Sequence, residues 1–293
     1  MKYKIAHTTT YDYSAPVPVS HNQVYLTPRQ LPQQECESNI LLIHPECANV
    51  VHRRDVFGNS CSHFSAEQPH KRIAITAKSV VKVSRNQLDL ELNQKPSWEM
   101  VAAEIKSADS SESIDAYQFS LPSPAISILS EVRAYAESIF SPGRSIDEAA
   151  TDLMSRIYSE FEYDPAATSV QSTIGDVLRL RRGVCQDFAH LQIACLRSLG
   201  LAARYVSGYI RTIPPEGETK LVGADASHAW LSIYCGNGKW LDLDPTNNQT
   251  INNDYVTLAW GRDYQDVSPV KGVIIGGGRH RIHVSVTMQE FGS

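Results

Sequence analysis

Cys185 is the residue of this sequence best placed to act as a nucleophile. It opens a run that begins after Gly183 and ends at Gly200, with the length and composition of a helix. A cysteine reacts as its thiolate, and the unpaired N–H groups at the start of a helix favour that charged form. We therefore predict a helix that starts at or next to Cys185, with the thiol available for covalent catalysis.

A nucleophilic thiol also needs a base, and the base needs a group that orients it. His228 and Asp244 are our candidates, because Ser227–Tyr234 and Lys239–Pro245 are typical of the two arms of a β-hairpin. A three-residue connection would place the two side chains opposite each other, and a five-residue connection would leave them diagonal on one face. A two-residue turn would separate them onto opposite faces. The hypothesis requires an odd connection or a bulge, and it leaves Asp242 open as well, because that residue shares the face of Asp244.

Two polar residues on the same helix are local alternatives. At ~100° per residue, His190 lies about 140° and Asp187 about 200° round the helix from Cys185, so both point away from the thiol. We expect them to orient the helix and to satisfy neighbouring loops. A zinc site of Cys185, His190 and His228 is the main chemical rival, but the chain lacks a C-x-x-C or H-x-x-x-H pair. We predict no metal.

The composition of the 293-residue chain excludes several classes of protein. Lys and Arg number 27 against 32 Asp and Glu, a net charge of −5, and no long basic run is present, so nucleic acid is not an expected partner. No apolar run approaches the ~20 residues that cross a bilayer, so no membrane span is expected. Six cysteines without a C-x-x-C pair do not form a disulfide framework, and the N-terminus lacks an apolar signal, which favours the cytoplasm.

The pattern along the chain indicates an α+β protein. Residues 1–85 are rich in short β-branched runs separated by turn residues, which predicts an antiparallel β domain. Residues 86–123 contain a polar run, Lys106–Ser113, which indicates a connecting segment. From residue 124 to residue 293 we expect a core of helices and strands, with helices over Ala125–Phe140 and Ile146–Phe161.

Several blocks of this sequence resemble the motif series of bacterial transglutaminase-like cysteine hydrolases, a family of cysteine proteases and related enzymes. The core blocks are Arg182–His190, Ala203–Tyr209, Ser227–Trp230 and Leu243–Asn247, in the family's order. Thr9–Tyr13 and Leu26–Arg29 resemble the β domain that precedes the core in that family, and Gly261–Pro269 resembles its C-terminal signature. The resemblance thus touches both ends of the chain.

The resemblance implies a papain-like transglutaminase core with a Cys-His-Asp triad. Cys185 would be the nucleophile, His228 the general base and acid, and Asp244 the residue that orients the imidazole, because the family's aspartate stands immediately before Pro-Thr. The implied activity is hydrolysis or acyl transfer at a peptide or protein amide through a thioester, without a cofactor. We expect a protease or amidase. The alternatives are a protein-crosslinking transglutaminase and a non-catalytic peptide-binding module of the same fold.

An acyl-transfer site also needs donors for the developing oxyanion. The backbone N–H of Cys185 is the first candidate, and the Tyr163 hydroxyl or Gln186 is the second. Trp230 is a candidate for the wall of the cleft, with core packing as the alternative. The sequence does not define an oligomeric state.

Overall fold

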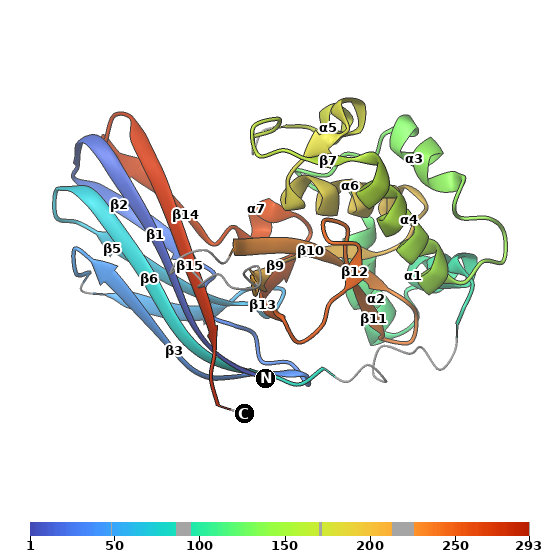
Figure 1. Ribbon diagram of the computed structural model, residues 1–293, viewed down its shortest axis with the longest axis horizontal. Helices are drawn as coiled ribbons and strands as arrows, with labels where there is room; N and C mark the ends of the chain where they lie inside the picture. Colours follow the sequence, from blue (N-terminus) through green and yellow to red (C-terminus); the bar gives the residue numbers. More distant parts are fainter. Residues whose placement is uncertain (48, 86–94, 170–171, 213–225, 293) are drawn as a thin grey trace, which may run out of the picture.

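The computed structural model describes residues 1–47, 49–85, 95–169, 172–212 and 226–292. A domain of long strands lies beside a mixed helical and β core (Figure 1). The described residues form three sheets of four or more strands, and the paired strands of these sheets are antiparallel. The α+β class predicted from the sequence is confirmed.

The β domain consists of two four-stranded sheets. The first has the order β15-β1-β6-β3, and the second has the order β14-β2-β5-β4. The strands from the N-terminal part are β1 (Lys2–Val17), β2 (Val19–Val24), β3 (Gln34–His44), β4 (Val50–Arg54), β5 (Ser60–Ala66) and β6 (His70–Val83). Along β1 the odd-numbered residues from Tyr3 to Thr9 are buried. One face of β1 therefore looks inward, as the period of two of a strand requires.

The last two strands return to this domain. β14 (Val270–Ile275) pairs with β2, and β15 (His280–Glu290) pairs with β1 from Tyr3↔Glu290 to Tyr13↔His280. The sequence predicts that all of residues 124–293 belong to the core, but β14 and β15 at this end belong to the β domain. Pairing with β14 and β15 satisfies the backbone edges that β1 and β2 would otherwise present to solvent. Local patterns do not show this pairing, because its two partners lie at opposite ends of the chain.

The described part of the expected connecting segment, residues 95–123, is helical and packs on the core. It contains α1 (Trp98–Ser107), α2 (Ser111–Tyr117) and a short 3₁₀ turn, η2 (Gln118–Ser120). Val101 and Ile105 of α1 are buried. The polar run that suggested a plain connection supplies the N-cap of α2, where Ser110 and Ser113 bond each other reciprocally. The remaining part of the expected segment, residues 86–94, lies outside the described residues.

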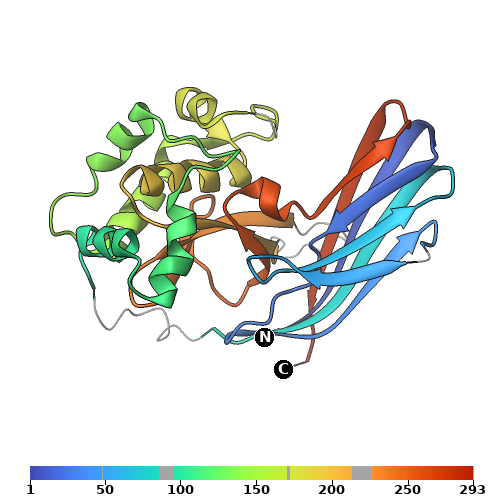
Figure 2. The ribbon, with the colours of Figure 1, turned by 180° about the vertical axis from the view of Figure 1, so that it is seen from behind.

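The core has a five-stranded sheet with helices against one side (Figure 2). Its strand order is β12-β11-β10-β9-β13. The strands are β9 (Ala203–Ile210), β10 (Ala226–Tyr234), β11 (Trp240–Asp244), β12 (Gln249–Thr250) and β13 (Tyr255–Gly261), and β7 (Glu162–Tyr163) pairs separately with β8 (Arg182–Gly183). The helices are α3 (Ser130–Glu137), α4 (Ile146–Glu160), α5 (Ile174–Leu180), α6 (Cys185–Ser198) and α7 (Tyr264–Val267). All residues of α6 from Asp187 to Ser198 are buried, so this helix is the centre of the core.

Polar side chains of the β domain fasten it to β13, an edge strand of the core sheet. The side-chain amide of Gln34 accepts from the Thr257 N–H at 2.7 Å and donates to the Thr257 carbonyl at 2.8 Å. Asn59 does the same at Trp260, with bonds of 2.9 and 2.8 Å. These side-chain amides bond backbone groups at the free edge of β13, as a neighbouring strand would. They thereby fix the orientation of the β domain relative to the core.

No helix within the described ranges is long and apolar enough to span a bilayer.

Candidate active site

The start of α6 is built around Asp187. Its Oδ2 accepts from the Val184 N–H at 2.8 Å and from the Thr168 hydroxyl at 2.6 Å. Gly183 has no side chain here, and a Cβ at that position would lie 2.7 Å from the same oxygen. Cys185 is consequently the first helical residue, and as in any helix the N–H groups of its first two residues, Cys185 and Gln186, have no acceptor one turn earlier in the helix.

His228 connects Cys185 to Asp244. Its Nε2 lies 2.7 Å from Asp244 Oδ2, and the ring lines the same cleft as Cys185, which contributes to raising the pKa of the ring. Because Asp244 occupies Nε2, the Nδ1 side of the ring is available to the sulfur. The structure therefore brings together the three residues that the sequence analysis selected as nucleophile, base and orienting carboxylate.

The pKa values of this pair shift in opposite directions. Burial lowers the pKa of His228, but hydrogen bonds to Asp244 and Cys185 outweigh it and raise the pKa to about 10. Burial would raise the pKa of Asp244, but its bond to His228 and the charge of that ring bring it below the usual value. Each partner stabilises the charged form of the other. At neutral pH the site holds an imidazolium and a carboxylate.

The hairpin register explains how His228 reaches Asp244. Tyr234 pairs with Trp240 and Leu231 with Leu243, so the connection has five residues and His228 and Asp244 are diagonal on one face. This is the second of the odd registers considered above. Asp242 lies opposite Ser232, where burial raises its pKa although Arg204 opposes this.

Two residues that the sequence analysis did not select hold the Asp244 carboxylate in place. The Tyr255 hydroxyl and Asn247 Nδ2 each donate to Oδ2 at 2.7 Å. The Thr246 N–H donates to Oδ1 at 2.9 Å. Asn247 lies three residues after the aspartate, so an Asx-type turn could have indicated it. Tyr255 comes from β13 and has no local signal.

The two proposed oxyanion donors lie at different places around the thiol. Gln186 follows Cys185 and lines the cleft. Tyr163 is 55% exposed, and burial together with the charge of Cys185 raises the pKa of its hydroxyl. Of these two described residues, Gln186 lines the cleft and Tyr163 does not.

The expectation that Trp230 walls the cleft is wrong. Trp230 is fully buried, with its ring 6.2 Å from that of His228 and 5.4 Å from that of Tyr255, centroid to centroid. It fills the space over Gly208, where a Cβ would lie 2.4 Å from the indole. Trp230 packs beside the His228 ring in the interior. This position leaves it no surface toward the cleft.

His190 occupies a different kind of site. Its Nε2 accepts a hydrogen bond from the Tyr264 N–H at 3.1 Å, and burial lowers its pKa to about 4. The ring is neutral and positions the backbone of Tyr264, which itself lines the cleft. Among the described residues, no three His, Cys, Asp or Glu side chains come together as metal ligands would.

The cleft at Cys185 has a volume of about 310 Å³ and lies between the core and the β domain. The core contributes Cys185 and His228. The opposite wall comes from the β domain, namely His7, Thr9 and Tyr11 of β1 and Ile282 and Val284 of β15. His7 bonds the hydroxyls of Tyr209 and Thr9, each at 3.0 Å, and so joins the two walls.

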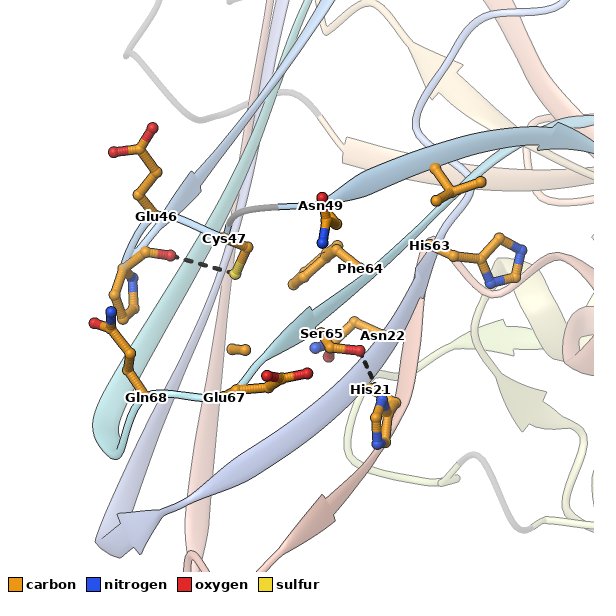
Figure 3. A pocket seen from close by; sticks show the side chains of 13 residues that line it. His21, Asn22, Glu46, Cys47, Asn49, His63, Phe64, Ser65, Glu67 and Gln68 are labelled. Atoms are coloured by element: carbon orange, nitrogen blue, oxygen red, sulfur yellow. Dashed lines mark hydrogen bonds between the residues drawn. The ribbon is translucent and has the colours of Figure 1, made fainter.

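A larger hollow of about 560 Å³ lies in the β domain (Figure 3). It contains Cys47, whose thiol donates to the Pro45 carbonyl at 3.5 Å, and burial raises the pKa of this thiol. His21 bonds Ser65 across neighbouring strands at 2.7 Å. None of the predicted site residues lines this hollow, so its size alone does not make it the reactive site.

Comparison with known proteins agrees with this architecture. Residues 3–82 match the bacterial transglutaminase-like N-terminal region, and residues 133–245 match the transglutaminase-like superfamily. A protein of Mycobacterium tuberculosis is 40% identical over 295 residues, covering 99% of this chain and 93% of its own length. A Mycobacterium leprae protein is 31% identical and covers 97% of each chain. The chain therefore belongs to the transglutaminase-like superfamily.

A solved structure shares the whole fold. It is a candidate cysteine protease of Cytophaga hutchinsonii, with a TM-score of 0.74 at 22% identity, covering 100% of this chain and 92% of that one. A protein-glutamine gamma-glutamyltransferase of Pseudomonas aeruginosa is 30% identical over 118 residues, which is 39% of this chain and 18% of that protein.

Proposed function

We propose that this protein is a thiol-dependent amide hydrolase that acts on peptides or proteins through a thioester on Cys185. The observation that carries the proposal is the position of His228, which bonds the Asp244 carboxylate at 2.7 Å and lines the same cleft as Cys185. A thiol, an imidazole and a carboxylate in sequence are the parts of a nucleophilic triad.

In the first half-reaction, the Cys185 sulfur forms a bond to the amide carbonyl carbon. The tetrahedral intermediate then collapses, the C–N bond breaks, and the departing amine nitrogen takes a proton from the His228 imidazolium. The products of this step are a free amine and a thioester, with a neutral imidazole beside it. Asp244 keeps the ring oriented throughout.

In the second half-reaction, water adds to the thioester carbonyl while His228 takes its proton. The C–S bond breaks, the acid product leaves, and the thiolate-imidazolium pair is restored. The backbone N–H of Cys185, at the start of α6, is our first candidate donor to the oxyanion in both steps, and one such donor is worth about 3 kcal/mol. Gln186 and Tyr163 are our candidates for the further donor.

Water is the acceptor that we favour over a second amine. Ile282 and Val284 of the cleft wall are 55% and 45% exposed, so the cleft is open to solvent. A cross-linking enzyme must instead disfavour water at the thioester. We also place the protein in the cytoplasm, which is supported by the free thiol state of all six cysteines.

Alkylation by iodoacetamide between pH 5 and pH 9, quantified by mass spectrometry at each cysteine, tests the proposal. We expect Cys185 to react much faster than Cys36 and Cys47 at pH 6.5, because burial raises the pKa of those two thiols. His228→Ala should remove most of this advantage. If Cys185 reacts no faster than Cys36 and the substitution changes nothing, a non-catalytic peptide-binding module becomes the better account.

A further inference from the structure

An apolar ledge on β15 borders the cleft. We define it as Ile282 and Val284, which are 55% and 45% exposed and which both line the cleft. They lie on the same face of the strand as Val286 and Met288, which are buried. The ledge is thus the uncovered end of a face that is otherwise packed.

The ledge lies beside the reactive residues. Ile282 pairs with Tyr11 and Val284 with Thr9, and both of these β1 residues line the same cleft as Cys185 and His228. β10, the strand that carries His228, also contacts β15. A molecule seated on the ledge would therefore extend directly to the sulfur.

β15 is also an edge strand. Within the described residues its only sheet neighbour is β1, so the outer edge of His280–Val286 has no sheet partner there. Edge strands take up extended peptides by main-chain hydrogen bonds, and alternate side chains of the added strand then meet alternate residues of the host. Ile282 and Val284 have this spacing of two.

The lining of the cleft specifies neutral side chains. Apart from the Cys185–His228 pair, its walls consist of apolar side chains, hydroxyls, a glutamine and the neutral His7, whose pKa burial lowers to about 4. A charged side chain would find no counter-charge in this wall and would lose hydration there.

We propose that the substrate is an extended peptide segment that adds to the edge of β15 and places two apolar side chains, two residues apart, on the Ile282–Val284 ledge. The β domain then selects the substrate and the core cleaves it. This inference rests on the proposed function, because it uses the reactivity of Cys185 as its readout.

Peptidyl chloromethyl ketones test the inference, since the thiolate displaces chloride and leaves a stable S–C bond. Acetyl-Leu-Ala-Leu-Gly chloromethyl ketone is compared with its Asp-Ala-Asp and Lys-Ala-Lys counterparts and with a backbone N-methylated Leu probe. Each alkylation rate at Cys185 is divided by the rate with iodoacetamide. We expect the Leu probe to react about tenfold faster than the charged probes, and N-methylation to remove most of that gain.

Matched variants locate the effect. Ile282→Thr combined with Val284→Thr keeps β-branched strand residues and removes the apolar surface, so the Leu probe should lose about tenfold while iodoacetamide is unaffected. The control is Val273→Thr on β14, an equivalent change at a residue that is 70% exposed and lies outside the cleft. It should alter neither rate.

The outcomes separate the two proposals. If Cys185 reacts rapidly with iodoacetamide but all peptide probes react alike, or the double variant keeps the preference, docking on β15 is wrong and the proposed function stands. If Cys185 is no more reactive than Cys36 toward iodoacetamide, both proposals fail together.

Discussion

His228 and His190 are two buried imidazoles near the start of α6, 8% and 5% exposed, and their pKa values shift in opposite directions. The pKa of His228 is raised to about 10, whereas that of His190 is lowered to about 4. Burial lowers the pKa of both rings, so the direction of each net shift depends on the hydrogen-bond partner at Nε2. The Asp244 carboxylate requires a proton on that nitrogen, whereas the Tyr264 N–H requires a lone pair.

The comparison shows that a histidine in the core becomes a base through its acceptor partner and its access to a thiol. Position on the same helix as the nucleophile is not sufficient.

The largest effect on the rate of amide hydrolysis should appear when each of the two histidines is substituted separately. We expect His228→Ala to lower the rate of peptide amide hydrolysis by roughly 10⁴-fold or more, because the departing amine loses its proton donor. His190→Gln keeps an acceptor for the Tyr264 N–H and should cost less than about tenfold. Product release from a mixed peptide library, followed by mass spectrometry, measures both. Equal losses of rate in the two variants would contradict the assignment of His228, and not His190, as the catalytic base.

Asp244→Asn tests the partner of His228. The amide would donate toward Nε2, so the ring would keep its proton on Nδ1 and could not take one from the thiol, and we expect a loss of about 10²- to 10⁴-fold in amide hydrolysis. The rise of the Cys185 alkylation rate with pH should also move to higher pH, because the ring no longer takes the proton of the thiol. An unchanged profile would mean that Asp244 does not set the charge of His228. Asp242→Asn is the matched control, and it should leave the profile in place.

The charge states predict opposite contributions to the pH dependence of stability. His190, with its pKa lowered from 6.5 to about 4, stabilises the fold fully above pH 6.5, and this contribution is lost as the pH falls toward 4. His228, with its raised pKa, stabilises below pH 6.5, and its contribution is lost as the pH rises toward 10. Between pH 7.5 and pH 5, His190→Gln should therefore lose about 2 kcal/mol less unfolding free energy than the parent. Urea titrations at both pH values measure the difference, and parallel losses in parent and variant would contradict a neutral buried His190.

The smallest expected effect is that of Tyr255→Phe. It removes one hydrogen bond of 2.7 Å to Asp244 and leaves the His228 bond intact, so we expect about 1 kcal/mol, or roughly five- to tenfold, in the rate of Cys185 alkylation at pH 6.5. Gln249 would lose a partner in the same variant, because its amide donates to the Tyr255 hydroxyl at 2.7 Å. Gln249→Ala is the control for that side effect, and it should change the alkylation rate less than Tyr255→Phe does.

The sequence alone was sufficient for the parts of the protein that depend on local chemistry. The start of α6 at Cys185 follows from the glycines that bound the run and from Asp187 at the third helical position, which caps it. The predicted Ile146–Phe161 helix corresponds to α4, Ile146–Glu160, because its apolar spacing and its Ser145 start are local signals. The predicted Ala125–Phe140 helix is shorter, and α3 spans Ser130–Glu137.

Only the tertiary structure decided which distant segments meet. The alternation of His280–Glu290 indicates a strand, but its partner, β1, is more than 260 residues away in every pair, and many strands would satisfy the same pattern. The wall that Tyr11, Ile282 and Val284 form opposite Cys185 follows from this long-range pairing. Tyr255 reaches Asp244 for the same kind of reason, because β13 enters the sheet beside β9 and not beside its neighbours in sequence.

The hairpin that carries His228 and Asp244 depends partly on local sequence and partly on tertiary contacts. The residue types and the alternation determined that both side chains belong to one face if the connection is odd. The five-residue connection, closed by the Cys235 N–H bonding the Lys239 carbonyl at 2.8 Å, is what made the pair diagonal. The sequence thus determined the chemistry of the site, whereas the register and the opposing wall depend on contacts between strands that no local pattern encodes.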